Sequence, residues 1–148
     1  MKLPKDKTVY SQYVPWLFAC YVLFIFRVTA QLIQKFYNLP FLPEFDAWHS
    51  GALTYPSLLA SQILIIGIMT WVIAGFVSGR VLVRYTLGVW LLMLGGIYFL
   101  VMVFRLMAGF TFATDHSWLG APIPAFFHIV LALFILLIGH FHYKHGRE

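Results

Sequence analysis

The chain has little charge. Only 10% of its 148 residues are charged, with five acidic residues against ten basic ones. A soluble domain usually carries about a quarter charged residues. A chain that is 61% hydrophobic, with a mean hydropathy of +0.85, would expose too much apolar surface in water. The composition therefore predicts an integral membrane protein whose surroundings are the lipid bilayer.

Several kinds of chemistry lack their usual motifs. Cys20 is the one cysteine, so no intrachain disulfide can form. There is no G-x-S-x-G, H-E-x-x-H or C-x-x-C motif and no phosphate-binding glycine loop, so catalysis has weak support and enzyme activity stays open. The basic residues are scattered, which argues against nucleic-acid binding. We interpret His140, His142 and His145 as facing anionic lipid headgroups, not a metal.

Long apolar runs are what the chain does have. Four stretches reach the roughly 20 residues that a helix needs to cross a bilayer. We predict an all-α, four-helix integral membrane bundle forming a single domain, 1–148, with spans at about 13–36, 55–77, 82–107 and 122–143. The lysine-rich start resembles a signal peptide, but the apolar pattern continues past Arg27 and favours an uncleaved first span. Gly88, Gly95 and Gly96 in the third span, with Ser61 and Gly67 in the second, are expected at close helix contacts.

The connecting segments differ in charge. The N-terminal segment, the turn between spans two and three and the C-terminal segment all hold basic residues. The two longer loops hold Glu44, Asp46 and Asp115 and no lysine or arginine. By the positive-inside rule, we predict that both termini are cytoplasmic and that both long loops lie outside.

The most informative stretch is 24–34, FIFRVTAQLIQ, in the first span. Arg27, Gln31 and Gln34 are spaced i, i+4, i+7, so they share one face of a helix. A charged residue inside a membrane helix is costly and faces a partner, a cavity or water. No acidic residue lies inside any span. The counter-charge of Arg27 must therefore come from a loop carboxylate, a backbone carbonyl, water or a bound anion.

Polar side chains from all four spans fall at one depth in the outer half of the bilayer. At a rise of about 1.5 Å per residue, this layer predicts a ligand-binding site made by Arg27, Gln31, Gln62, Arg105 and His128. Two simpler interpretations stay open. Glutamine and histidine can hydrogen-bond neighbouring helices as packing contacts, and Arg105 is close enough to the interface for its side chain to extend into the headgroups.

The two outer loops are rich in aromatic residues. Such residues are typical of the belt at a membrane interface. Loops of this length are also often functional, and a lid over an outward-facing pocket is the sharper interpretation. The predicted lid residues are Glu44, Asp46, Trp48, His49, Asp115 and His116.

The leading functional hypothesis is a small multi-pass protein that binds an amphiphile, a lipid headgroup or a quinone, in this outward-facing polar pocket. The alternative is a structural or assembly subunit, associated with other membrane proteins or with further copies of itself. A haem redox protein or an intramembrane enzyme is the second alternative. For haem, only His128 paired with Met102 or His49 is geometrically conceivable, because paired histidines on two spans are missing.

Overall fold

The computed structural model describes residues 8–112, 115 and 118–147. This part of the chain forms four α-helices, each long and apolar enough to cross a membrane, and one short 3-10 helix. The elements are α1 (Thr8–Tyr37), η1 (Phe45–Trp48), α2 (Tyr55–Val77), α3 (Tyr85–Thr111) and α4 (Pro122–His145). The predicted all-α membrane bundle of four helices is confirmed.

The predicted start of the first span is corrected by the structure. α1 begins at Thr8 and not near residue 13, so Pro15 lies inside the helix and not in its first turn. The extra residues are held by tertiary packing. Tyr10 is only 3% exposed, and its hydroxyl donates to the carbonyl oxygen of Val81 at 2.9 Å. Packing of this kind extends helices beyond what local hydropathy predicts.

Local sequence explains where other helices begin and end. Pro56 and Pro122 lie at the first positions of α2 and α4, where a missing N–H costs nothing. The end of α2 is a Schellman motif, in which Gly79 has a φ of +63°. The backbone N–H of Arg80 then donates to the carbonyl of Gly75 at 3.1 Å. This turn leads the chain from α2 toward α3.

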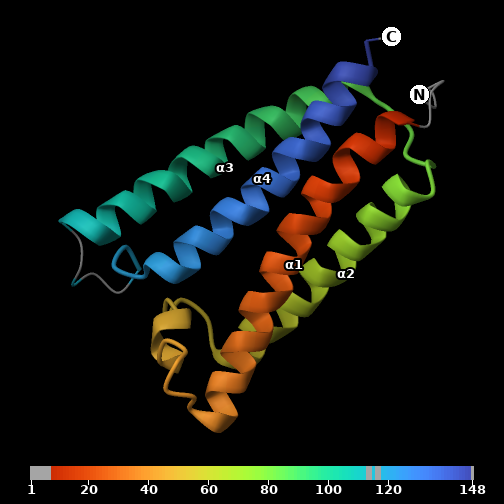
Figure 1. The fold of residues 1–148 in the computed structure, drawn as a ribbon. Helices are drawn as coiled ribbons and strands as arrows, with labels where there is room; N and C mark the ends of the chain where they lie inside the picture. Colours follow the sequence, from red (N-terminus) through yellow and green to blue (C-terminus); the bar gives the residue numbers. More distant parts are fainter. Residues whose placement is uncertain (1–7, 113–114, 116–117, 148) are drawn as a thin grey trace.

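The helices form two pairs that diverge toward one end of the bundle (Figure 1). α3 and α4 pack closely, α1 contacts both α2 and α4, and α2 makes no close backbone contact with α3 or α4 within the described residues. α1 and α4 therefore join the two pairs. The start of α1 and the end of α4 share the narrow end, and the two long loops share the wide end.

Glycine allows the close approach of α3 and α4. A Cβ atom added at Gly88 would lie 2.3 Å from the backbone nitrogen of Tyr143, a distance that real atoms do not adopt. Helix backbones in a membrane come this close where small residues face each other. The same role predicted for Gly67 and Gly96 is wrong, because a Cβ atom there would meet nothing within 4 Å. Hydropathy cannot distinguish a glycine that faces a helix from one that faces open space.

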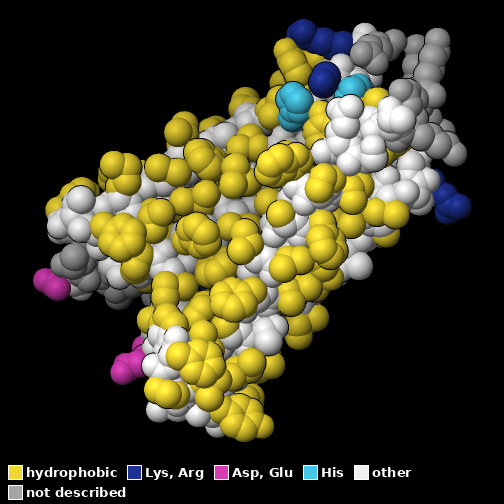
Figure 2. All heavy atoms as spheres, in the orientation of Figure 1, with side chains coloured by type: hydrophobic (Ala, Val, Ile, Leu, Met, Phe, Trp, Pro, Cys, Tyr) yellow, Lys and Arg dark blue, Asp and Glu magenta, His cyan; other side chains and the backbone are white. Residues whose placement is uncertain are grey.

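Charge separates along the bundle. Figure 2 shows hydrophobic side chains over the middle of the visible face, lysine, arginine and histidine at the narrow end, and acidic side chains at the wide end. The middle has no charged atoms on that face, which suits contact with lipid tails. The buried polar side chains of the long helices include Arg27, Gln31, Gln62 and Arg105.

The predicted polar face of α1 is buried. Arg27, Gln31 and Gln34 are 5%, 0% and 3% exposed. Gln34 satisfies the end of its own helix: its side-chain oxygen accepts from the backbone N–H of Leu39 at 2.9 Å, and its amide donates to Asn38 Oδ1 at 3.1 Å. Arg27 lines the cavity between the helix pairs, whereas Gln31 contacts Gln62 of α2.

Candidate functional site

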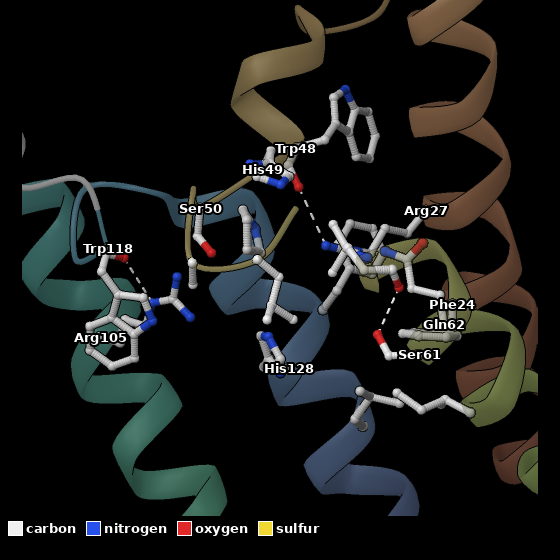
Figure 3. A pocket seen from close by; sticks show the side chains of 17 residues that line it. Phe24, Arg27, Trp48, His49, Ser50, Ser61, Gln62, Arg105, Trp118 and His128 are labelled. Carbon is white, nitrogen blue, oxygen red and sulfur yellow. Dashed lines mark hydrogen bonds between the residues drawn. The ribbon is translucent and has the colours of Figure 1, made fainter. Parts of the chain in front are cut away.

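A cavity of about 200 Å³ lies between the two helix pairs, at the wide end of the bundle. All four long helices line it, together with residues of both long loops. Figure 3 shows Arg27 on one side of this space, Arg105 on the other and His128 between them. The polar or charged side chains of its wall are those of Arg27, His49, Ser50, Ser61, Gln62, Arg105 and His128.

Arg27 has weak partners for a buried cation. Its Nη2 donates to the backbone carbonyl of Trp48 at 3.4 Å, near the outer limit for a hydrogen bond. Its guanidinium carbon lies 5.7 Å from the ring centroid of Phe127. Its buried Nε has no hydrogen-bond partner among the described residues. The guanidinium therefore keeps unused hydrogen-bonding capacity next to the cavity.

Arg105 is held more firmly than Arg27, by a residue of the loop between α3 and α4. Its Nε donates to the backbone carbonyl of Trp118 at 3.0 Å, and its guanidinium carbon lies 4.2 Å from the centroid of the same indole. Nη1 reaches Met102 Sδ at 4.0 Å, a weak contact. The side chain is 2% exposed, and its Nη2 has no partner in the part of the chain that the structure describes.

Neither buried arginine is neutralised by a carboxylate among the described residues. The acidic residues of the wide end, Glu44, Asp46 and Asp115, are all exposed, and neither Arg27 nor Arg105 forms an ion pair with them. Of the counter-charges considered for Arg27, the structure provides one backbone carbonyl. Two cations thus line one small space, which favours an anion there.

His128 and Gln62 complete the wall. His128 Nδ1 shares a hydrogen bond with the hydroxyl of Tyr98 on α3, which orients the imidazole ring. Gln62 Nε2 donates to Gln31 Oε1 at 3.2 Å, and this bond joins α2 to α1. Gln31 is fully buried and does not line the cavity. Its bond to Gln62 is the packing contact that the simpler interpretation predicts.

The loop between α1 and α2 forms part of the cavity wall through Trp48, His49, Ser50, Ala52 and Leu53. Trp48 is 3% exposed, its Nε1 donates to Pro43 at 3.0 Å, and its ring stacks on Phe127 with centroids 6.3 Å apart. An indole so buried does not belong to an interfacial belt. His49 also lines the cavity, and its Nδ1 accepts from the backbone N–H of Gly51 at 3.0 Å.

The other predicted lid residues are not brought to the cavity. Glu44, Asp46 and Asp115 are exposed and do not line it, and His116 lies outside the described residues. Within those residues no group of three or more histidine, cysteine or acidic side chains could hold a metal ion.

Of the histidines in α4's last turns, His142 departs from the headgroup-facing position expected, whereas His140 is exposed. His142 is buried and its Nδ1 accepts from the backbone N–H of Arg84 at 3.4 Å. His140 Nδ1 shares a hydrogen bond with the Tyr13 hydroxyl at 2.9 Å. These contacts join α4 to the start of α3 and to α1.

Comparison with known proteins adds nothing to this geometry. The chain matches no protein-family model, no curated protein and no solved structure. The case for a function therefore depends on the residues themselves.

Sequence reasoning missed three contributors to this region. Trp118 binds Arg105 through both its carbonyl and its ring, Ser61 lines the cavity, and Tyr98 orients His128. Ser61 is a polar residue inside an apolar span, and that is the signal that could have identified it. No sequence signal identifies a backbone carbonyl as the partner of a distant arginine.

Proposed function

We propose that this small membrane protein binds the polar head of an amphiphile in the cavity between Arg27 and Arg105. The observation that carries the proposal is the pair of buried guanidinium groups from different helices. Each has an N–H donor without a partner, and neither pairs with a carboxylate, among the described residues. A charged arginine at the centre of a membrane helix is unfavourable by about 2.5–3.5 kcal/mol. A bound anion would offset such a cost most for Arg27, which lies further from the end of its helix than Arg105 does.

The size of the cavity favours a headgroup over a complete ligand. A space of about 200 Å³ is smaller than the roughly 300–1,000 Å³ of pockets that enclose drug-sized molecules. A phosphate or carboxylate head with its tail left in the bilayer satisfies both the charge and the volume. A quinone head, whose carbonyl oxygens would accept from a guanidinium or an imidazole, is the uncharged alternative. A porphyrin is larger than this space.

The orientation of the chain completes the proposal. Positive residues at the narrow end predict that this end is cytoplasmic, so the cavity would lie in the outer half of the membrane. Trp48 and His49 would form part of its outer wall. The ligand would then come from the outer leaflet or from the outer side.

The test uses protein purified in mild detergent, from which small molecules are extracted and identified by mass spectrometry. We expect a stoichiometric anionic amphiphile or quinone with wild type and its loss with Arg27→Gln and with Arg105→Gln. Lys144→Gln is the control, because it removes one exposed positive charge outside the cavity. After delipidation, dodecyl phosphate and decylubiquinone are added back to distinguish the two headgroup classes.

Three results would contradict the proposal. Equal retention of every co-purifying molecule by wild type and both arginine variants would show that the cavity is not the site. A Soret band in the absorption spectrum would favour a haem protein. A stoichiometric protein partner with no bound small molecule would favour a structural or assembly subunit.

A further inference from the structure

A second hollow lies at the narrow end of the bundle, away from the two-arginine cavity. It is a groove of about 800 Å³, lined by the end of α2, the turn that follows, the start of α3 and the last turns of α4. α2 and α3 make no close backbone contact in the described chain. The groove therefore separates two helices that are consecutive in sequence.

Most of the groove wall is apolar. It includes the side chains of Trp71, Val72, Val81, Leu87, Leu91 and Ile138. Trp71 is 78% exposed and Leu87 is 39% exposed, although both belong to helices long and apolar enough to span a membrane. Inside a bilayer, the molecules available to cover such a surface include lipid acyl chains.

Two arginines from the turn between α2 and α3 line one end of the same groove. Arg80 and Arg84 both line it and both are exposed. The Schellman turn positions the backbone of Arg80, and the hydrogen bond from Arg84's backbone N–H to His142 holds the second residue against α4. The described acidic residues, Glu44, Asp46 and Asp115, belong to the loops of the opposite end. The two arginines therefore bring positive charge to this end of the groove, and no acidic residue lines it among the described residues.

We propose that this groove binds one anionic phospholipid, with its acyl chains against the apolar wall and its phosphate at Arg80 and Arg84. Arginine guanidinium groups bind phosphate oxygens with two parallel hydrogen bonds. Basic pockets between membrane helices are a recognised class of site for anionic headgroups. The site shares no residue with the cavity between Arg27 and Arg105. The two proposals can therefore be tested independently.

The experiment is a titration of the detergent-purified chain with dioleoyl phosphatidylglycerol or dioleoyl phosphatidylcholine, followed by native mass spectrometry. One variant is Arg80→Gln with Arg84→Gln. Its matched control is Lys144→Gln with Arg147→Gln, which removes the same charge from the same end but outside the groove. A third variant, Ala74→Trp, fills the groove from an exposed position on α2.

We expect wild type to bind one phosphatidylglycerol in preference to phosphatidylcholine. At roughly 1 kcal/mol for each basic residue, the Arg80→Gln, Arg84→Gln variant should bind phosphatidylglycerol about 30-fold more weakly. The matched control should stay close to wild type. Ala74→Trp should weaken binding of both lipids, because it blocks the space for acyl chains that they share.

Four results would overturn the proposal. Equal losses in the two double variants would show diffuse attraction by surface charge. Equal affinity of wild type for both lipids would show that the arginines select no headgroup. Unchanged binding by Ala74→Trp would place the lipid elsewhere. A wild-type dimer that Ala74→Trp converts to a monomer would mean that a second copy of the chain covers the groove.

Discussion

Replacement of Arg27 by leucine tests the proposed site most directly, because the partners that the protein itself offers this residue are weak. One hydrogen bond of 3.4 Å and one cation–π contact of 5.7 Å contribute about 0.5–1 kcal/mol each. On insertion scales, arginine at a helix centre costs about 2.5–3.5 kcal/mol, whereas leucine gains about 0.3–0.6 kcal/mol. The ligand-free leucine variant should therefore be more stable than ligand-free wild type, by about 2 kcal/mol on these same scales.

Binding should change in the opposite direction. A hydrogen bond to a charged group contributes about 1.5–3 kcal/mol. Loss of the guanidinium should therefore weaken the binding of an anionic amphiphile by about 10- to 150-fold. Arg27→Lys should restore part of this affinity, because an ammonium retains the charge but lacks the planar fork of donors. Stability and binding thus separate in the leucine variant.

The assay combines thermal unfolding in detergent, monitored by size exclusion after heating, with mass spectrometry of retained small molecules. Delipidated samples report the stability of the protein alone. A delipidated Arg27→Leu variant that unfolds at lower temperature than delipidated wild type would refute the reasoning, since Arg27 would then be a packing residue. Unchanged stability together with unchanged retention would mean that Arg27 lies outside the membrane core.

Three further predictions follow from the fold and the sequence. Reporter fusions after Gly79 should be cytoplasmic and fusions within either long loop should be external; the reverse would move the cavity to the inner leaflet. Gly88→Ala should destabilise the bundle by about 1–3 kcal/mol in thermal unfolding because its Cβ has no room, whereas Gly96→Ala should be neutral, and equal effects would argue against close packing at Gly88. A double-mutant cycle with Gln31→Leu and Gln62→Leu should give a coupling energy of about 0.6 kcal/mol, with about 1.7 kcal/mol as an upper value. A coupling energy of zero would show that this hydrogen bond does not stabilise the bundle.

The predicted polar layer shows how far depth counting can reach. Helical rise and four apolar spans were enough to predict that Arg27, Gln62, Arg105 and His128 lie at one level, and these four line one cavity. Whether they bind a ligand stays a prediction. Gln31 lies on the same face of α1 as Arg27, one helical turn further along. At that position the face contacts α2 through Gln62 and does not line the cavity.

The loops show where the same reasoning stops. Of the lid residues expected over the site, Trp48 and His49 line the cavity, whereas the carboxylates Glu44, Asp46 and Asp115 are exposed. The loops instead supply the backbone carbonyls of Trp48 and Trp118 to the two arginines. Every residue has such a carbonyl, so no residue type marks the ones that accept.

The sequence alone predicted the membrane environment, the number of spans and the bounds of α2. Each depends on local properties: hydropathy summed over about 20 residues, and proline or glycine at helix ends. Tertiary structure alone decided that the pairs diverge, that α2 stands apart from α3 and α4, and that a cavity and a groove lie at opposite ends. The physical reason is that lipid is as apolar as a helix surface, so hydropathy does not select helix partners. Close fit does so instead, as at Gly88 against Tyr143, and fit is a property of two surfaces together.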